Sequence, residues 1–581
     1  MDDLVPVGFQ LRRDPGTRLI VGGSRLGGGA VLVGGSPTRV LRLTASGARQ
    51  VADWLEDKPV GDGVAARQLA RKLLDAGIVH PGPGVSRASQ DVITARSGAT
   101  DGDPTLTHAD VTLAHADVTV VIPVKDRQDE LARCLAGLAD TAGSGSAGES
   151  PSEGGWRRAA SPLGAVIVVD DCSADPAATV AIAAAAGARV IRRPVNGGPG
   201  AARNTGLAAA TTELVAFLDS DCVPAAGWLD AILPHFADPV VGAVAPRIVP
   251  HEPARTSAGR GWIARYEGVS STLDMGARPS IVRPGARVPY VPGAALVVRR
   301  AAAGDGFTPG MRVGEDVDFA WRLAAAGWRV RYEPAAVMGH QHRVRLRPWM
   351  SRRADYGTSA AHLEELHPGS VRPLYASRWT LAAWGAALAV RPRWAGVAVA
   401  AGVTGVATAM LARRLSTVTG EGWPLPGQRA GVPGAAGDGR SAGGGSAGPA
   451  GSGWAAWRLA ARLAGGGTLA AGRPLGSAIS RTWWPAVIPL AVAVPRLRLP
   501  VAALLVAPPL LDWADRRPPL GPVRYMAARL LDDAAYSCGV WQGCVRRRSL
   551  RAVLPVVTGR AGSGRGTGTL RPGSTPGPAS P

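Results

Sequence analysis

Between residues 118 and 221 the sequence alternates apolar, β-branched runs with alanine-rich amphipathic segments. "VTVVIPV" (118–124) and "AVIVVDD" (165–171) have the composition of strands, and "DELARCLAGLAD" between them has helical spacing. Parallel strands that are buried on both faces have this continuous Val and Ile content, and helices cross between them. The alternation continues to about residue 345 and predicts an α/β fold with an open, Rossmann-like sheet.

Three of these strands run directly into residues that are candidates for a binding site, nearly all of them polar. They are Pro123, Asp126, Asp170, Asp171, Asp219, Ser220 and Asp221. The carboxyl ends of parallel strands share one edge of the sheet, and open α/β folds bind their ligands there. A single such ending could be a helix cap, but three endings on one edge indicate a binding site.

Asp219 and Asp221 stand one residue apart after the apolar run "LVAFL". In an extended chain, this spacing puts both carboxylates on one side. Close carboxylates repel each other unless a cation lies between them. A hard divalent ion that also binds phosphate oxygens suits the pair, and a solvated turn is the alternative.

Three further motifs lie around this pair. "NGGPGAARNTG" (196–206) predicts either a glycine-rich turn that offers N–H groups to phosphate or an ordinary tight turn, with Arg203 and Asn204 at the helix start. "GEDVDFAWRL" begins a helix whose acidic first turn either complements the helix dipole or supplies a general base. His340 in "GHQH" is a candidate third ligand for Mn²⁺, or a loop histidine.

Taken in order, the motifs resemble the inverting glycosyltransferases of family 2, which have the GT-A fold. The matching segments are "VTVVIPVKD", "VVDDCSAD", "NGGPGAARNTGLAAA", "FLDSDCVP", "VPGAALVVRR", "GEDVDFAWRL" and "PAAVMGH". They cover about 118–345, and the ordered set is far more specific than any single motif. The resemblance implies transfer of a sugar from a UDP-sugar, with Mn²⁺ or Mg²⁺ as cofactor, in a domain at 118–372.

The resemblance also implies roles for individual residues. Asp316 is expected to be the catalytic base that accepts the proton of the acceptor hydroxyl. The metal is expected on Asp219, Asp221 and His340, where it would stabilise the leaving diphosphate. The nucleotide sugar is expected at Pro123, Asp126, Asp170, Asp171, Arg203, Asn204, Asp219 and Ser220, and the acceptor at Gly293, Glu315 and Arg322.

Residues 1–85 predict a separate unit, which a polar linker at 86–117 joins to the α/β region. Short strands such as "AVLVGG" precede two amphipathic helices, which indicates a small α+β, winged-helix-like domain. It resembles a PqqD-type peptide-recognition domain. Its fusion to a family 2 transferase is similar to the glycosyltransferases of the mycofactocin system. That resemblance implies glucose transfer onto a peptide-derived redox cofactor as a β-linked oligosaccharide, in contact with other maturation proteins of that system.

The C-terminal part is rich in Ala, Gly, Pro and Arg. It predicts apolar helical segments at 373–419 and 476–557, a Gly/Ala-rich linker at 420–475 and a disordered tail at 558–581. The apolar runs are at or below the roughly 18–20 residues of a spanning helix. Residues 341–581 hold 30 Arg and 9 acidic residues, which accounts for the whole net charge of +21. A basic, apolar segment favours an anionic membrane surface, with an arginine-rich compositional bias as the alternative.

The expected location is the cytoplasm, in association with the inner face of the cell membrane. The 5 cysteines form no CxxC pair or zinc-like spacing, which favours a reducing compartment. Nucleic-acid binding is disfavoured because the arginines alternate with apolar runs and not with base-stacking aromatic residues. Two other functions remain open: a membrane-associated transferase with a lipid-linked or polysaccharide acceptor, and a non-catalytic peptide carrier.

Overall fold

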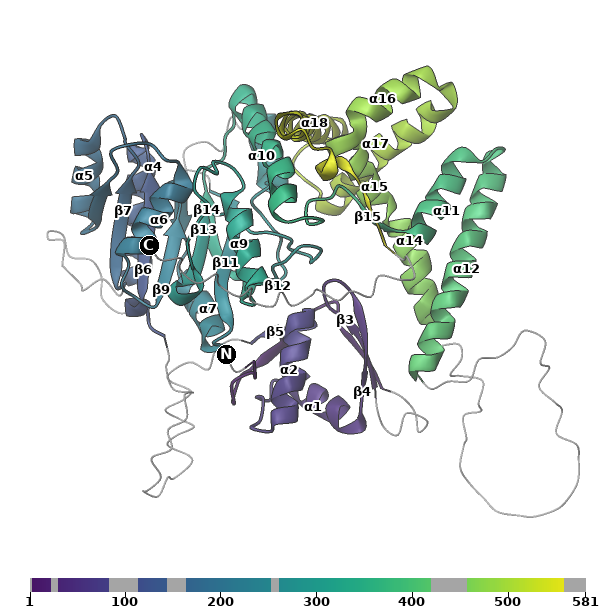
Figure 1. The fold of residues 1–581 in the computed structure, drawn as a ribbon, viewed down its shortest axis with the longest axis horizontal. Coiled ribbons are helices and arrows are strands. Elements are labelled where there is room, and N and C mark those ends of the chain that lie inside the picture. The colour runs from purple at the N-terminus through teal and green to yellow at the C-terminus, as the bar shows by residue number, and fades with distance from the viewer. Residues whose placement is uncertain are drawn as a thin grey trace, which may run out of the picture.

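The computed structural model of this chain describes residues 3–21, 30–82, 113–143, 163–251, 261–419 and 457–558. Its centre is a nine-stranded sheet with the order β10-β14-β11-β13-β9-β6-β7-β8, in which β12 also pairs with β14. Figure 1 shows this sheet in blue and teal, with the purple N-terminal unit below it and the green and yellow C-terminal helices beside it. Most of the two predicted linkers and nearly all of the predicted tail lie outside the described residues.

The first half of the sheet has the predicted α/β alternation. Its parallel strands and their crossover helices are β6 (Val118–Val124), α4 (Gln128–Gly143), β7 (Ala165–Asp170), α5 (Pro176–Ala185), β8 (Arg189–Arg192), α6 (Pro199–Ala209) and β9 (Leu214–Leu218). The Asp175 side chain caps α5 by accepting a hydrogen bond from the Ala178 N–H at 3.0 Å, and Pro176 takes the first helical position.

The second half makes the sheet mixed, because β13 runs antiparallel to both β9 and β11. Its strands are β10 (Cys222–Pro224), β11 (Val241–Pro250), β12 (Ser280–Ile281), β13 (Ala295–Arg299) and β14 (Arg329–His340). The accompanying helices are α7 (Trp228–Ile232), η3 (Leu233–Ala237), α8 (Trp262–Ser270), η4 (Arg300–Ala302) and α9 (Glu315–Ala325). A further short turn, η2 (His115–Asp117), directly precedes β6 in the first half. The short strand β10 pairs antiparallel with the end of β14, so Cys222 lies opposite His340.

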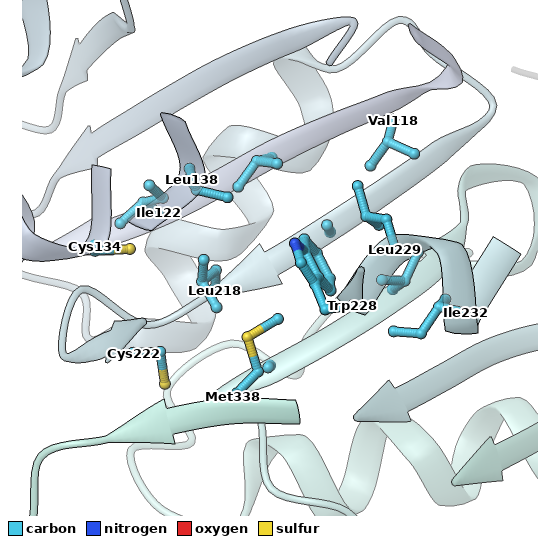
Figure 2. Close-up of a cluster of buried hydrophobic side chains, with 14 of the residues drawn as sticks. Val118, Ile122, Cys134, Leu138, Leu218, Cys222, Trp228, Leu229, Ile232 and Met338 are labelled. Carbon is cyan, nitrogen blue, oxygen red and sulfur yellow. The ribbon is translucent and has the colours of Figure 1, made fainter. Parts of the chain in front are cut away.

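Apolar side chains cover both faces of the sheet, as the strand composition predicts. Val118 and Ile122 of β6 point into one cluster with Leu218, Trp228 and Met338, which Figure 2 shows in close-up. Val121, the residue before Ile122, points the other way and belongs to the cluster on the opposite face. Burial of one such side chain stabilises the fold by about 1.5–3 kcal/mol, so the two clusters hold the strand ends in fixed positions.

The N-terminal unit contains both strands and helices, in the predicted order. They are β1 (Leu11–Arg13), β2 (Arg18–Val21), β3 (Ala30–Gly34), β4 (Arg39–Leu43), α1 (Ala45–Leu55), α2 (Val64–Ala76) and β5 (Val79–Pro81). Strands β2, β3 and β4 form one antiparallel sheet, and β1 pairs with β5. Gly77 ends α2 at φ 66°, a left-handed conformation that a residue without a Cβ adopts at low cost.

Two ion pairs, of which Arg71–Asp238 is fully buried, fix this unit to the α/β domain. The Arg71 guanidinium of α2 donates to both carboxylate oxygens of Asp238, at 2.8 and 2.7 Å. Asp14 accepts at 2.8 Å from the guanidinium of Arg287, which lies in the loop between β12 and β13. Loss of one partner of a buried pair costs about 3–5 kcal/mol, so the two units have a specified relative position.

The C-terminal part is helical. Its elements are α10 (Leu346–Leu366), β15 (Tyr375–Ser377), α11 (Arg378–Ala389), α12 (Arg393–Thr419), η5 (Ala461–Gly465), α14 (Gly466–Ala470), α15 (Gly472–Ala478), η6 (Ile479–Trp483), α16 (Trp484–Ala493), α17 (Pro495–Arg516), α18 (Pro522–Arg547), η7 (Arg551–Val553) and β16 (Val556–Thr558). Figure 1 shows α11 with α12 and α16 with α17 as two pairs that extend from the body.

Two sequence-based expectations for this part differ from the structure. Residues 457–475, expected within the linker, are helical, and the Trp384 indole N–H donates to the Thr468 carbonyl at 2.8 Å. Tertiary packing outweighs the low helix propensity of their glycines. The apolar runs were also expected to be at or below spanning length. However, Arg393–Leu415 (23 residues) and Pro495–Arg516 (22 residues) are long and apolar enough to cross a membrane.

Helix α18 packs closely on α10. A Cβ atom on Gly539 would lie 1.8 Å from the Ala354 carbonyl oxygen, and one on Gly357 would lie 2.1 Å from the Tyr536 carbonyl oxygen. Only glycine fits at both crossing points. The buried Asp532 of α18 accepts from the Arg353 guanidinium of α10 at 2.8 Å, which adds a charged contact to the close backbone approach.

Candidate active site

A cavity of about 890 Å³ lies at the carboxyl ends of β6, β7 and β9. Two walls of this cavity are defined by the residues that line them. The sheet wall comprises residues 123–125, Arg127, Asp171, residues 219–221 and His340, and the helical wall comprises Tyr356, Arg481 and Tyr536. Nine cationic side chains line the cavity against six acidic ones, which favours an anionic ligand such as a diphosphate. The cations are Lys125, Arg127, Arg203, Arg312, Arg343, Arg352, Arg353, Arg372 and Arg481.

Asp219 and Asp221 both lie on the sheet wall, but they have different partners. Asp219 accepts from the Arg203 guanidinium at 2.6 Å. Asp221 has an ion pair with Arg127, and its other oxygen lies 3.4 Å from His340 Nε2. Burial opposes ionisation of Asp221, but His340 and Arg127 outweigh it and lower the pKa of this carboxyl. Asp221 and His340 therefore form a carboxylate–imidazole pair at the strand end.

Asp171 holds the glycine-rich turn against the end of β7. Its carboxylate accepts from the backbone N–H groups of Gly197 at 3.1 Å and Gly198 at 2.8 Å. Helix α6 begins at the next residue, Pro199. The turn, the first residues of α6 and Asp171 all line the cavity, so the glycine-rich motif and the end of β7 meet at one place.

Arg203 connects the sheet wall to helix α9. Its side chain is 2% exposed and donates to Asp219 and, at 2.9 Å, to Glu315. Burial and the neighbouring Asp316 carboxylate raise the pKa of Glu315 to about 7, although Arg203 opposes the shift. Arg203 thus positions two acidic side chains that come from segments about a hundred residues apart.

Asp316 lies at the start of α9 and faces the loop before β13. Its carboxylate accepts from the Gly293 N–H at 2.6 Å. A Cβ atom on Gly293 would lie 2.8 Å from the Asp316 Cβ, so this loop can approach α9 only with glycine at that position. Both residues line the cavity, and the Asp316 carboxylate has the position of a group that could accept a proton there.

Comparisons with known proteins agree with this architecture. The model of the Glycosyl transferase family 2 matches residues 119–302, and that of the Glycosyl transferase family group 2 matches residues 214–420. The pre-mycofactocin glycosyltransferase of Mycobacterium tuberculosis is 36% identical over 570 residues, which cover 95% of this chain and 98% of that protein. The chain belongs to glycosyltransferase family 2, in the pre-mycofactocin glycosyltransferase group.

Solved structures with similarity to this family 2 glycosyltransferase include two enzymes with bound nucleotides. The mannosyltransferase of Pyrobaculum calidifontis with GDP-Man and Mn²⁺ is 21% identical and covers 53% of this chain and 80% of its own, with a TM-score of 0.31. The glucosyl-3-phosphoglycerate synthase of Mycobacterium tuberculosis with Mn²⁺ and UDP is 19% identical and covers 46% and 86%, with a TM-score of 0.29.

Four of the residues that the sequence nominates have structural partners in the glycosyltransferase and lie outside the cavity lining. The Asn204 amide donates to the Phe307 carbonyl at 2.8 Å and accepts from the Phe307 N–H at 2.7 Å. Arg322 donates to Asp318 at 2.9 Å and to the Gly306 carbonyl at 2.6 Å. Asp170 accepts from the Ser173 N–H, and Asp126 accepts from the Ala174 N–H. These bonds orient the four side chains toward the protein itself.

The metal that family 2 implies has a partial set of protein ligands. Within the described parts of the chain, no three His, Cys, Asp or Glu side chains meet as a metal cage. Asp221 and His340 nevertheless face each other, and His340 Nδ1 is buried without a hydrogen-bond partner. Mn²⁺ and Mg²⁺ bind readily to one or two protein side chains when substrate phosphates supply the other oxygens. The residues therefore fit a metal that arrives with a diphosphate.

Several cavity residues of the glycosyltransferase have no signal in the sequence. Tyr290, Tyr356 and Tyr536 line the cavity, although they lie in a loop, in α10 and in α18. Arg127 follows the nominated Asp126, but its contact with Asp221 depends on the pairing of the parallel strands β6 and β9, which brings their carboxyl ends together. Only the three-dimensional arrangement brings these side chains to the site.

Proposed function

We propose that this enzyme transfers a hexose, glucose, from a UDP-sugar to pre-mycofactocin with inversion at the anomeric carbon. The observation that supports this most is the single cavity that contains the Asp219–Asp221 strand end and the Asp316 carboxylate. The first supplies a site for the leaving diphosphate and the second a base for the incoming hydroxyl. The named relative, similar over 95% of the chain, supports the acceptor.

The sheet wall provides the charge that the donor requires. Sugar transfer leaves a nucleoside diphosphate with additional negative charge, which cations stabilise. A divalent ion held by Asp221 and His340 would act as a Lewis acid on that diphosphate. Arg203 holds Asp219 in place, and Arg127 and Lys125 bring positive charge to the same strand ends.

The Asp316 carboxylate performs the proton transfer in this proposal. The acceptor hydroxyl loses its proton to Asp316 as its oxygen forms a bond to the anomeric carbon, and the bond to the diphosphate oxygen breaks. One displacement from the opposite face inverts the configuration. The Gly293 N–H donates to one oxygen of this carboxylate and the Val317 N–H donates to the other, which fixes its orientation.

The N-terminal unit supports a peptide-derived acceptor. The loop between β12 and β13 binds Asp14 through Arg287, and the Ser36 hydroxyl accepts from the Arg287 N–H. Gly285 and Ala286, the two preceding residues of this loop, line the cavity. A peptide-recognition unit in this position would hold an acceptor or its carrier within reach of the reacting groups.

The test is incubation of the purified chain with a panel of UDP-sugars, Mn²⁺ and pre-mycofactocin, followed by mass spectrometry. We expect addition of one or more hexose units with UDP-glucose, and loss of transfer after removal of the metal. Asp221→Ala should lower transfer by about 100-fold or more. Asp305→Ala, at an exposed carboxylate of the same domain, is the matched control. Full transfer by Asp221→Ala would reject the metal site.

A membrane-associated transferase with a lipid-linked acceptor is the second candidate. The two long apolar helices favour it, because Trp394 and Val397 of α12 are 75% and 61% exposed. Arginines at the helix ends would meet anionic headgroups. In flotation with phosphatidylglycerol and with phosphatidylcholine vesicles, the full chain should bind the anionic vesicles preferentially. Transfer to a lipid-linked acceptor but not to pre-mycofactocin would replace the first proposal with this one.

A further inference from the structure

The helical wall consists of residues from segments outside the α/β domain. Arg481 lies in η6 and Tyr536 in α18, and both line the cavity together with Tyr290 and Tyr356. Tyr290 also lies near the reacting groups. Burial raises its pKa to about 12, and its charged and polar neighbours include Tyr536, Arg481 and Asp316. The C-terminal helices therefore reach the same cavity as Asp316.

Buried polar contacts hold these helices in place. Arg353 of α10 donates to Asp532 of α18 at 2.8 Å and also pairs with Glu267, whose carboxylate accepts from the Trp349 indole N–H at 2.7 Å. On the next residue of α18, Asp533 accepts from the Ser480 hydroxyl at 2.6 Å. Asp533 also accepts from the Arg481 guanidinium at 3.1 Å, so Arg481 has a defined position beside Tyr536.

Two tyrosine rings on this side of the cavity each lie close to a guanidinium group. The Arg481 guanidinium carbon lies 4.4 Å from the centre of the Tyr536 ring, and that of Arg352 lies 4.8 Å from the Tyr356 ring. Aromatic faces and edges attract other aromatic rings, and guanidinium groups attract π-systems and anionic or carbonyl oxygens. Tyrosine rings beside guanidinium groups therefore suit a planar π-system that carries an oxygen.

We propose that Tyr290, Tyr356, Tyr536 and Arg481 form an acceptor subsite for a planar aromatic group that carries an oxygen, and that the C-terminal helices thereby determine acceptor specificity. This inference rests on the proposed glycosyl transfer. It assigns a function to a part of the chain that donor binding does not require. The donor contacts the sheet wall, and the group that accompanies the acceptor hydroxyl contacts the helical wall.

The experiment compares two acceptors that differ only in the aglycone, 4-nitrophenyl β-D-glucoside and methyl β-D-glucoside, with UDP-glucose as donor. For the wild-type chain we expect a KM about tenfold lower for the aryl glucoside, which corresponds to about 1.4 kcal/mol. Tyr536→Ala should remove this preference. The KM for UDP-glucose and the slow hydrolysis of UDP-glucose without acceptor should not change, because the sheet wall is intact.

Tyr536→Phe retains the ring and should retain most of the preference, which separates stacking from a role in folding. Arg546→Ala changes an exposed residue of the same helix and is the matched control. Equal KM values for the two glucosides in the wild-type chain, or an unchanged preference in Tyr536→Ala, would overturn the subsite while leaving the proposed function in place. Absence of both transfer and hydrolysis with every UDP-sugar would overturn the proposed function as well.

Discussion

The sheet wall of the cavity comes from one continuous sheet edge, whereas the helical wall comes from three segments that are far apart in the sequence. Backbone hydrogen bonds of the sheet place Asp171, Asp219 and Asp221, because the first two directly follow β7 and β9 and the third directly precedes β10. Close packing of α18 on α10 and the buried Arg353–Asp532 pair place Tyr536. In the proposed function, a general ligand such as a diphosphate would contact the first wall, and a particular acceptor the second.

Replacement of Asp316, which lines the same cavity as the two walls, should have the largest effect on transfer. Asp316→Asn retains the size of the side chain and an acceptor for the Gly293 N–H, but the amide cannot take the proton of the acceptor. We expect kcat to fall by about 10³-fold, with the affinity for UDP in the presence of Mn²⁺ unchanged. Stopped assays of transfer and calorimetric titration with UDP measure the two quantities, and Asp305→Asn is the control.

A loss of less than tenfold would mean that another group accepts the proton. Glu315, the preceding residue, is the alternative carboxyl. It pairs with Arg203, and the pH dependence of stability tests its protonation state independently.

Glu315 should make stability depend on pH. Burial raises its pKa to about 7, from an ordinary value of 4.5, so the folded state binds a proton more tightly than the unfolded state. The free energy of unfolding should therefore fall as the pH rises from 4.5 to about 7, and level off above that. The contribution of this group is about 3 kcal/mol. Denaturant titrations of wild type and Glu315→Gln between pH 5 and 8 measure it as the difference between the two curves.

A constant difference between the two curves would contradict the raised pKa. If wild type instead becomes more stable relative to Glu315→Gln as the pH rises, the Arg203 pair outweighs burial, because ionised Glu315 then stabilises the fold.

The sequence predicts the sheet and much of the sheet wall for a physical reason. β-branched runs form buried strands, and a residue that directly follows a strand has its position fixed by that strand. Asp171, Asp219 and Asp221 line the cavity accordingly. Position on a helix is less decisive, because Arg203 and Asp316 line the cavity, whereas Asn204 and Arg322 bind backbone groups outside it.

The helical wall has no comparable local signal. The contact between residues near 354 and 539 depends on glycines that permit a close helix crossing, and no periodicity pairs two helices so far apart. The helical turns at 457–475 were missed for a related reason. Their glycines favour coil in isolation, and packing against neighbours such as Trp384 determines their structure.

Gly539→Ala should disturb the helical wall selectively. The added Cβ would lie 1.8 Å from the Ala354 carbonyl oxygen, a backbone atom that cannot move aside without a shift of the whole helix. We expect a loss of about 1–3 kcal/mol in unfolding free energy and a higher KM for the acceptor, while the KM for UDP-glucose stays the same. Gly402→Ala is the control, because no atom lies within 4 Å of a Cβ at that helical position. Equal losses in donor and acceptor affinity would show that the two walls are not independent.

Asn204→Ala should have the smallest effect, and it separates the sequence-based role from the structural one. As a ligand of the nucleotide, Asn204 would raise the donor KM by about tenfold or more when replaced. As an anchor for Phe307, it should lower the unfolding free energy by about 1–2 kcal/mol and leave the donor KM within twofold of wild type. Thermal unfolding and donor titration distinguish these outcomes. The donor KM is the decisive quantity, because both polar atoms of the Asn204 amide are already hydrogen-bonded to the Phe307 backbone.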